Sequence, residues 1–153
     1  MRYDGESKPH HIILEQLAAI FELVPVCPEV EAGLPIPRPP VQLTGSLNHP
    51  RLTGRDDASI DVTETLQRYC EKRIPELDSL DGFILKSRSP SCGLNSTPVF
   101  IDGHCVTETS RGVFARELRR RYPDMPIIEE TRLENPEALA NFISMTKARK
   151  STE

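Results

Sequence analysis

The chain has 153 residues, of which 37% are hydrophobic and 27% charged, values typical of one soluble globular domain. A formal net charge of -4 offers no electrostatic attraction to nucleic acid, so nucleic-acid binding is not expected. Since no apolar stretch reaches the roughly 20 residues of a membrane span and the first residues lack the apolar core of a signal peptide, we expect a cytoplasmic protein with reduced thiols and no membrane partner.

The first third of the chain predicts a helix, a short strand and a stiff connection. Apolar residues at helical spacing predict a helix from His10 to Phe21. Leu23–Val26 has the pattern of a short strand. Prolines then crowd into Pro25–Pro40 and exclude a helix or an interior strand there, because each proline lacks a donor N–H. We expect an extended connection, and a polyproline surface linker is the alternative. Residues 41–53 are expected to be irregular or to form a small hairpin.

The middle of the chain predicts a capped helix and a buried strand. Asp61 and Glu64 have the spacing of a capping arrangement, and the helix that follows should run to about Arg73. Gly82–Leu85 is a continuous apolar run, which is typical of a strand buried on both faces. Arg88–Gly103 is rich in Ser, Pro, Gly and Asn, and a loop is expected there.

The last third predicts two helices around one more strand. Ser110 could cap a helix that ends at Tyr122, and Pro126–Ile128 has the pattern of a third short strand. Asn135-Pro136 makes a good helix start, with proline at the first helical position and an end near Thr146.

These elements together predict an α/β fold: a small three-layer structure with a short parallel sheet flanked by helices. Three strands are few for this architecture, so the sheet is expected to lack its first strand. We expect a single domain over residues 1–146 and a polar C-terminal tail over residues 147–153.

Two of the four cysteines occupy the turns that matter most for function. Cys27 and Cys92 each follow a short apolar run and adjoin proline or glycine. In α/β proteins such strand-end turns bind ligands, so the two thiols could meet around one metal centre. Their separation matches no compact ligand motif, and buried structural cysteines are the alternative. Glu29 supplies an acid or base beside Cys27, and the Lys86–Ser91 segment supplies donors suited to an anion or a sulfide near Cys92.

The other two cysteines are weaker candidates. Cys70 falls on the apolar stripe of its predicted helix and is expected to be a core residue. Cys105 adjoins His104, a pair of good metal ligands, but neighbouring residues on a strand point to opposite faces.

Several segments resemble the bacterial family catalogued as domain of unknown function 523, whose characterised members are thiouracil desulfidases. The resemblance runs in order from the N-terminus to about Leu133. It is carried by Arg2-Tyr-Asp-Gly5, Leu23-Val-Pro-Val-Cys-Pro-Glu-Val30, Gly33-Leu-Pro-Ile-Pro-Arg-Pro-Pro40, Asp61-Val-Thr63 and Ile84-Leu-Lys-Ser-Arg-Ser-Pro-Ser-Cys-Gly93.

The resemblance implies a [4Fe-4S] cluster held by three cysteines, with one iron open to the sulfur of a thio-nucleobase. Water would then replace the sulfur and leave the oxo base. Matched by motif, Cys27 and Cys92 are two cluster ligands, Glu29 is the proton shuttle and Ser89 is a polar group near the substrate. The implied partner is a small molecule: free thiouracil, a thio-nucleoside or its monophosphate.

One departure from the family pattern concerns the remaining ligand. Members carry an apolar strand ending in Cys-Leu-Leu-Gly shortly before Arg-Tyr-Asp-Gly, whereas Met1 directly precedes Arg2 here. This predicts either a truncated reading frame or a degenerate homologue with two of three ligands. Three functions therefore stay open: a desulfidase, a non-catalytic iron–sulfur or zinc-binding homologue, and a module that docks a partner.

Overall fold

A two-stranded parallel sheet forms the middle layer of the molecule. The structure is a computed structural model that describes residues 10–151. Strands β3 (Phe83–Leu85) and β6 (Ile127–Glu129) pair in parallel, with Phe83 opposite Ile127. Because successive side chains on a strand point to opposite faces, the short apolar runs supply two buried faces. The two strands that the sequence predicts in this part of the chain are confirmed.

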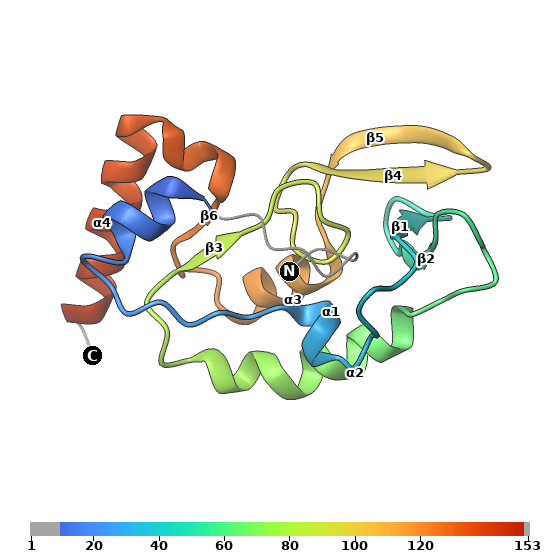
Figure 1. Ribbon diagram of the computed structural model, residues 1–153, viewed down its shortest axis with the longest axis horizontal. Helices are drawn as coiled ribbons and strands as arrows, with labels where there is room; N and C mark the ends of the chain where they lie inside the picture. Colours follow the sequence, from blue (N-terminus) through green and yellow to red (C-terminus); the bar gives the residue numbers. More distant parts are fainter. Residues whose placement is uncertain (1–9, 152–153) are drawn as a thin grey trace.

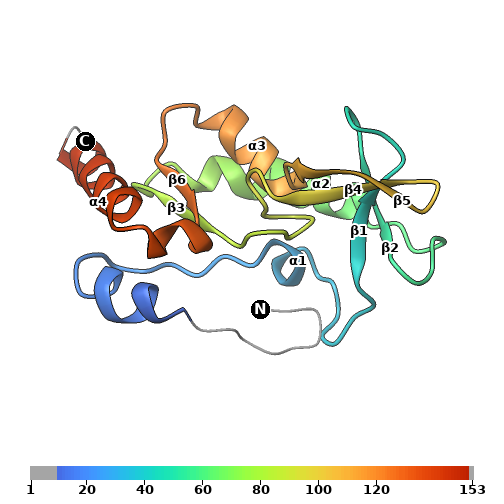
Figure 2. The ribbon, with the colours of Figure 1, turned by 90° about the horizontal axis from the view of Figure 1, so that it is seen from above.

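Helices cover both faces of this sheet, as Figures 1 and 2 show. Phe83 and Leu85 pack in the core cluster of α2 (Thr63–Arg73) and α3 (Val113–Arg121). Ile84 and Ile128 belong to the cluster on the other face, with side chains of η1 (Ile13–Leu17) and α4 (Pro136–Ser151). The predicted arrangement of a short parallel sheet between helices is therefore confirmed.

A second sheet lies beside this layered core and has the strand order β2-β1-β4-β5. Strands β1 (Val41–Thr44) and β2 (Arg51–Gly54) form an antiparallel hairpin, β1 pairs in parallel with β4 (Thr97–Ile101), and β4 pairs antiparallel with β5 (His104–Ser110). The β4–β5 hairpin extends away from the helices in Figure 1. Leu43, Leu52 and Val99 are completely buried with Leu66 of α2, which joins this sheet to the rest of the core.

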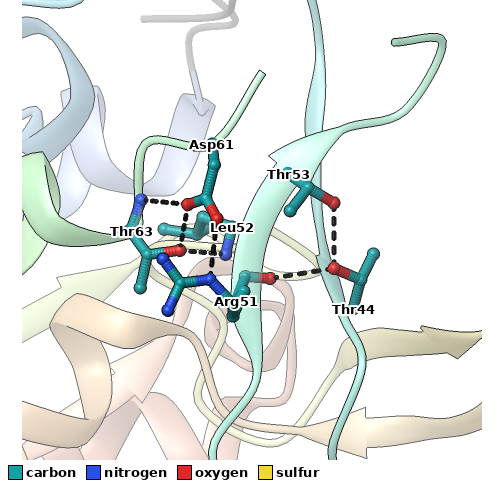
Figure 3. A network of polar contacts seen from close by, with 6 residues as sticks. All are labelled: Thr44, Arg51, Leu52, Thr53, Asp61 and Thr63. Atoms are coloured by element: carbon teal, nitrogen blue, oxygen red, sulfur yellow. Dashed lines mark hydrogen bonds and ion pairs between the residues drawn. The ribbon is translucent and has the colours of Figure 1, made fainter. Parts of the chain in front are cut away.

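A polar network around Asp61 fixes the β1–β2 hairpin to the start of α2 (Figure 3). One Asp61 oxygen accepts hydrogen bonds from the backbone N–H and the hydroxyl of Thr63, at 3.0 and 2.6 Å. The other accepts from Arg51 Nε at 2.7 Å. Burial opposes the effect, but these donors lower the pKa of Asp61 from 3.8 to about 2. Asp61 accepts the N–H of Thr63, the first helical residue, but the N-cap position is Val62 and not Asp61 as the sequence predicted.

One predicted strand does not pair, and one predicted loop contains a strand. Leu23–Val26 is extended but belongs to neither sheet, and Leu23 and Val24 are exposed. Prolines at positions 25 and 28 remove backbone donors that a strand ladder needs, which accounts for its failure to pair. The loop predicted for Arg88–Gly103 contains β4, whose Val99 is buried between β1 and β5 although Pro98 precedes it.

Helix ends differ from the predictions in the first helix, at the start of α3 and at the C-terminal end of α4. The first helix is short, with a π-helical turn at Ile13–Leu17 that places Ile12 and Leu17 in the same buried cluster. Helix α3 begins after Gly112 and not at Ser110, because Ser110 still belongs to β5. Helix α4 begins at Pro136 as predicted, with Asn135 Oδ1 accepting the Ala138 N–H at 3.0 Å.

Helix α4 also continues to Ser151, so residues 147–151 of the predicted polar tail are helical. Lys147, Arg149 and Lys150 lie near the C-terminal end of the helix dipole, where positive charge is favourable. The domain boundary at residue 146 and the missing first strand stay predictions. The Arg2–Gly5 motif lies outside the described residues. Within residues 10–151, no helix is long and apolar enough to cross a bilayer.

Candidate functional site

Cys27 stands directly before the short helix α1 (Pro28–Glu31). Proline at the first helical position favours a helix start there, so the Cys27-Pro28 pair makes a defined corner. Glu31 Oε2 accepts the Cys27 backbone N–H at 3.1 Å. Glu31 Oε1 accepts from Tyr69 Oη at 2.8 Å and from Arg73 Nε at 3.1 Å, both on α2. The turn that carries Cys27 is thereby anchored to α2.

Cys92 lies in a tight turn that follows β3 and is closed by Ser89. The Ser89 hydroxyl accepts the backbone N–H groups of Ser91 and Cys92, at 3.2 and 3.1 Å. The Ser89 carbonyl accepts the Gly93 N–H and the Thr97 hydroxyl, each at 2.9 Å. Ser89 therefore fixes the backbone around Cys92 from both its hydroxyl and its carbonyl.

The N-terminus of α3 packs on the same turn. The N–H groups of Phe114 and Ala115 donate to the Ser91 carbonyl at 2.8 and 3.1 Å, and the Gly112 N–H donates to the Gly93 carbonyl at 2.7 Å. A Cβ atom on Gly112 would lie 2.4 Å from the Ser91 carbonyl carbon and 2.7 Å from the Cys92 nitrogen. Only glycine allows the two backbones to approach this closely.

Glu29 bridges the two cysteine turns. Its Oε1 accepts the Ser91 hydroxyl at 3.2 Å, and its Oε2 accepts Arg38 Nη2 at 2.6 Å. The Arg38 side chain is only 3% exposed and Ser91 only 1%. In Figures 1 and 2, α1 lies beside the loop that follows β3, in agreement with this contact. The site thus combines two thiols with a carboxylate that accepts hydrogen bonds at both oxygens.

The Cys92 thiol is buried and lies close enough to Glu29 and Cys27 to feel both electrostatically. Burial raises the pKa of Cys92 to about 12, and the nearby Glu29 carboxylate and Cys27 raise it as well, while the Ser89 hydroxyl opposes the shift. At neutral pH Cys92 is therefore a protonated thiol in the protein alone. A positively charged metal centre at this place would reverse that preference, since coordinating thiols lose their protons.

Two carboxylates at the end of β6 hold the segment that leads to Cys92. Glu130 accepts Lys86 Nζ at 2.9 Å, the Ser87 N–H at 2.6 Å and the Ser87 hydroxyl at 2.7 Å. Although burial opposes it, these donors hold the pKa of Glu130 below its ordinary value. Glu129 is buried and accepts the Leu94 N–H at 3.2 Å and the Ser96 hydroxyl. The loop is fixed before and after its cysteine.

The structure brings together the site residues expected from the sequence: Cys27, Glu29, Ser89 and Cys92. Two of the donors that the sequence analysis expected around Cys92 bind another group, because Lys86 and Ser87 donate to Glu130. Ser91 was expected to be a donor near Cys92, and it donates to Glu29. The sequence interpretation missed Arg38, Gly112, Glu129 and Glu130. Arg38 stands in a motif segment quoted above, which was the available signal, whereas the other three carry no local sequence signal.

The other cysteines are placed as the sequence suggested. Cys70 is 2% exposed in the core cluster of α2 and α3, and burial raises its pKa to about 12. Cys105 is exposed on β5, with its Sγ donating to the Thr107 carbonyl at 3.2 Å. Among residues 10–151, no three His, Cys, Asp or Glu side chains are grouped so that they could hold a metal ion. The described residues therefore fit a metal centre only in part, through two thiols.

No curated protein matches the chain. Among solved structures, the chain is similar to the [4Fe-4S]-dependent thiouracil desulfidase TudS, with 29% sequence identity and a TM-score of 0.69. The match covers 91% of this chain and 87% of the other. The family model described as 2-thiouracil desulfurase matches residues 1–130, which include the Cys27 and Cys92 turns and both strands of the parallel sheet. The chain belongs to the 2-thiouracil desulfurase family.

Proposed function

We propose that this protein removes sulfur from a thiolated uracil base, nucleoside or nucleotide. In the reaction the C=S group takes up water and becomes C=O, and the sulfur leaves as hydrogen sulfide without any net oxidation or reduction. The observation that carries the proposal is the meeting of Cys27, Cys92 and Glu29 at one place. Family membership and the likeness to a solved thiouracil desulfidase support the same chemistry.

We further propose that Cys27 and Cys92 are two ligands of a [4Fe-4S] cluster. With three protein ligands, the fourth iron of such a cluster would stay open to the substrate. Residues 10–151 do not supply the third ligand beside these two thiols. Such a cluster supplies a Lewis acid and a sulfur acceptor, by the same open-position logic as catalytic zinc. Thiolates are the usual ligands of iron–sulfur clusters, and the two cysteines come from turns that are each fixed by several hydrogen bonds.

Glu29 is the proposed proton carrier of the reaction. A carboxylate within reach of the reacting atoms can take a proton from water and later give one to the leaving group or to a base nitrogen. Arg38 and Ser91 each donate to one oxygen of Glu29, so both ends of its carboxylate are held in place. Ser89 is the proposed polar group near the substrate, in addition to its contacts within the turn.

The donor set also supports one alternative function. With two thiols and no third donor grouped with them among the described residues, the chain could be a metal-binding homologue without desulfidase activity. Zinc or a cluster of another type would then occupy the same cysteines. The two functions differ in one product, which is sulfide.

Anaerobic reconstitution with iron and sulfide, followed by incubation with 2-thiouracil, tests the proposal. We expect a brown protein that releases sulfide and uracil in equal amounts. Cys27→Ala and Cys92→Ala should lose both colour and activity, whereas Glu29→Ala should keep the colour and lose activity. Cys105→Ala is the matched control and should behave as the parent, because Cys105 lies on the exposed β5 strand. Full activity of Cys27→Ala would overturn the ligand assignment, and a brown but inactive parent would favour the alternative.

A further inference from the structure

Arg38 is the one buried arginine of the described chain that contacts the proposed proton carrier. Its side chain is 3% exposed, and its Nη2 lies 2.6 Å from Glu29 Oε2. Arginine stays protonated at every pH that proteins tolerate, so a permanent positive charge is buried beside the carboxylate. We propose that Arg38 is a positioning residue that fixes the orientation of the Glu29 carboxylate for proton transfer. The inference rests on the proposed function of Glu29.

The contacts at Glu29 explain why a second anchor is needed. The last torsion of a glutamate side chain has no sharp staggered minima, so a carboxylate held at one oxygen can turn. Ser91 holds Oε1 at 3.2 Å, which is a long contact for an O–H donor. Arg38 holds Oε2 at 2.6 Å, a short charge-assisted contact. Together the two donors fix the plane of the carboxylate relative to the Cys92 turn.

The backbone around Arg38 is suited to this role. Pro37 precedes it and Pro39 and Pro40 follow it, and each proline ring restricts φ of its own residue. Arg38 Nη1 also reaches the Pro35 carbonyl at 3.4 Å, a weaker contact that ties the guanidinium to its own segment. The proline-rich segment therefore presents the guanidinium from a stiff backbone, so little backbone freedom is lost when Arg38 holds Glu29.

A purely structural explanation accounts less well for the pair. Buried ion pairs are weak evidence for stability, because apolar side chains of similar volume often do as well or better. Other ion pairs, such as Arg51 with Asp61 and Lys86 with Glu130, have at least one partner that is more exposed than either member of this pair. Arg38 differs from them in its burial and in the residue it contacts, which lies two positions from Cys27.

A double-mutant cycle on the reconstituted protein tests the inference. In protein that carries Glu29, Arg38→Met should lower kcat for sulfide release from 2-thiouracil about 10²-fold, the loss expected from a misplaced catalytic group. KM should change by less than about threefold, since Arg38 is not proposed to touch the substrate. Arg38→Lys should recover part of kcat, because a lysine can still place one charge near Oε2.

The second half of the cycle separates positioning from an independent effect. In the Glu29→Gln background, Arg38→Met should change kcat by less than about threefold, because the group that it positions is already gone. Arg51→Met, which breaks an ion pair away from the site, should leave kcat unchanged. The inference is overturned if Arg38→Met leaves kcat unchanged, or if it lowers kcat by the same factor in both backgrounds.

A structural readout keeps the inference apart from the proposed function. The crystal structure of Arg38→Met, or of Arg38→Lys if the first variant does not fold, is examined at the Glu29–Ser91 contact. A carboxylate that has turned away from Ser91 supports positioning, even if the parent protein releases no sulfide. A carboxylate that keeps its place without a partner at Oε2 overturns it. Absence of sulfide release from the parent refutes only the proposed function.

Discussion

Gly112→Ala adds one methyl group at the closest approach between α3 and the Cys92 turn. The new Cβ would lie 2.4 Å from the Ser91 carbonyl carbon, 2.5 Å from the Ser91 carbonyl oxygen and 2.7 Å from the Cys92 nitrogen. All three atoms belong to the backbone, so no side chain can turn aside. The φ and ψ angles of Gly112, -67° and 161°, are open to alanine, so the effect of the substitution is steric and not conformational.

The size of the effect follows from the displacement that the methyl group requires. Carbon atoms in contact prefer about 3.5–4.0 Å, so helix α3 and the turn must separate by roughly 1 Å. This shift weakens the Gly112–Gly93 and Phe114–Ser91 hydrogen bonds, which measure 2.7 and 2.8 Å. Overpacking of this kind costs about 1–3 kcal/mol. A 1 Å displacement of Cys92 and Ser91 relative to Glu29 should also lower kcat about 10²-fold.

Urea unfolding and sulfide-release assays on the reconstituted variant measure the two effects. Gly103→Asn at the tip of the β4–β5 hairpin is the control, because Gly103 has nothing within 4 Å and its φ of 77° is tolerated by asparagine. The control should keep its kcat and lose less than about 1 kcal/mol of stability. A Gly112→Ala protein with unchanged stability and kcat would refute the role given to this contact.

Three further predictions concern charge and thiol chemistry. The lowered pKa of Asp61 stabilises the fold above pH 4, and this contribution is lost as the pH falls from 3.8 to about 2. Asp61→Asn should therefore cost about 1–2 kcal/mol in urea unfolding at pH 7 and almost nothing near pH 2. An equal cost at both pH values would contradict the assignment. Glu130→Gln removes the negative charge to which Lys86 and Ser87 donate, so it should lower the free energy of unfolding by about 1–3 kcal/mol and speed alkylation of the Cys92 thiol. An unchanged alkylation rate would show that Glu130 does not restrain the loop. Cys105 should react with a thiol reagent before any buried cysteine does, as mass spectrometry of partly labelled protein can check, because it is the exposed thiol of the described residues.

Elements with a strong local pattern could be predicted from the sequence. The apolar residues of Phe83–Leu85 and the two isoleucines at 127 and 128 face both sides of the sheet, and such short apolar runs indicate strands. Asp61 and Asn135 carry the side chains that satisfy helix N-termini, and both do so. The cysteine turns could be singled out because proline, glycine and glutamate surround them.

Elements that depend on distant partners could not be predicted. Strand β4 begins in a Ser-, Pro- and Asn-rich segment, and only pairing with β1 and β5 makes it a strand. Leu23–Val26 shows the reverse case, since its apolar pattern lacks a partner strand. The contact of Arg38 with Glu29 joins two positions in a proline-rich segment whose path no periodicity reveals. Gly112 matters only because another backbone approaches it.

The source of the new oxygen atom provides the most direct test of the central claim. The reconstituted protein is incubated with 2-thiouracil in water enriched in oxygen-18 under anaerobic conditions, and the uracil is analysed by mass spectrometry together with the released sulfide. We expect one labelled oxygen per uracil, one sulfide per uracil, and a strongly lowered rate of formation of both products in Glu29→Gln protein that keeps its brown colour. Unlabelled uracil, or an unchanged rate in Glu29→Gln, would contradict desulfuration by water with Glu29 as the proton carrier.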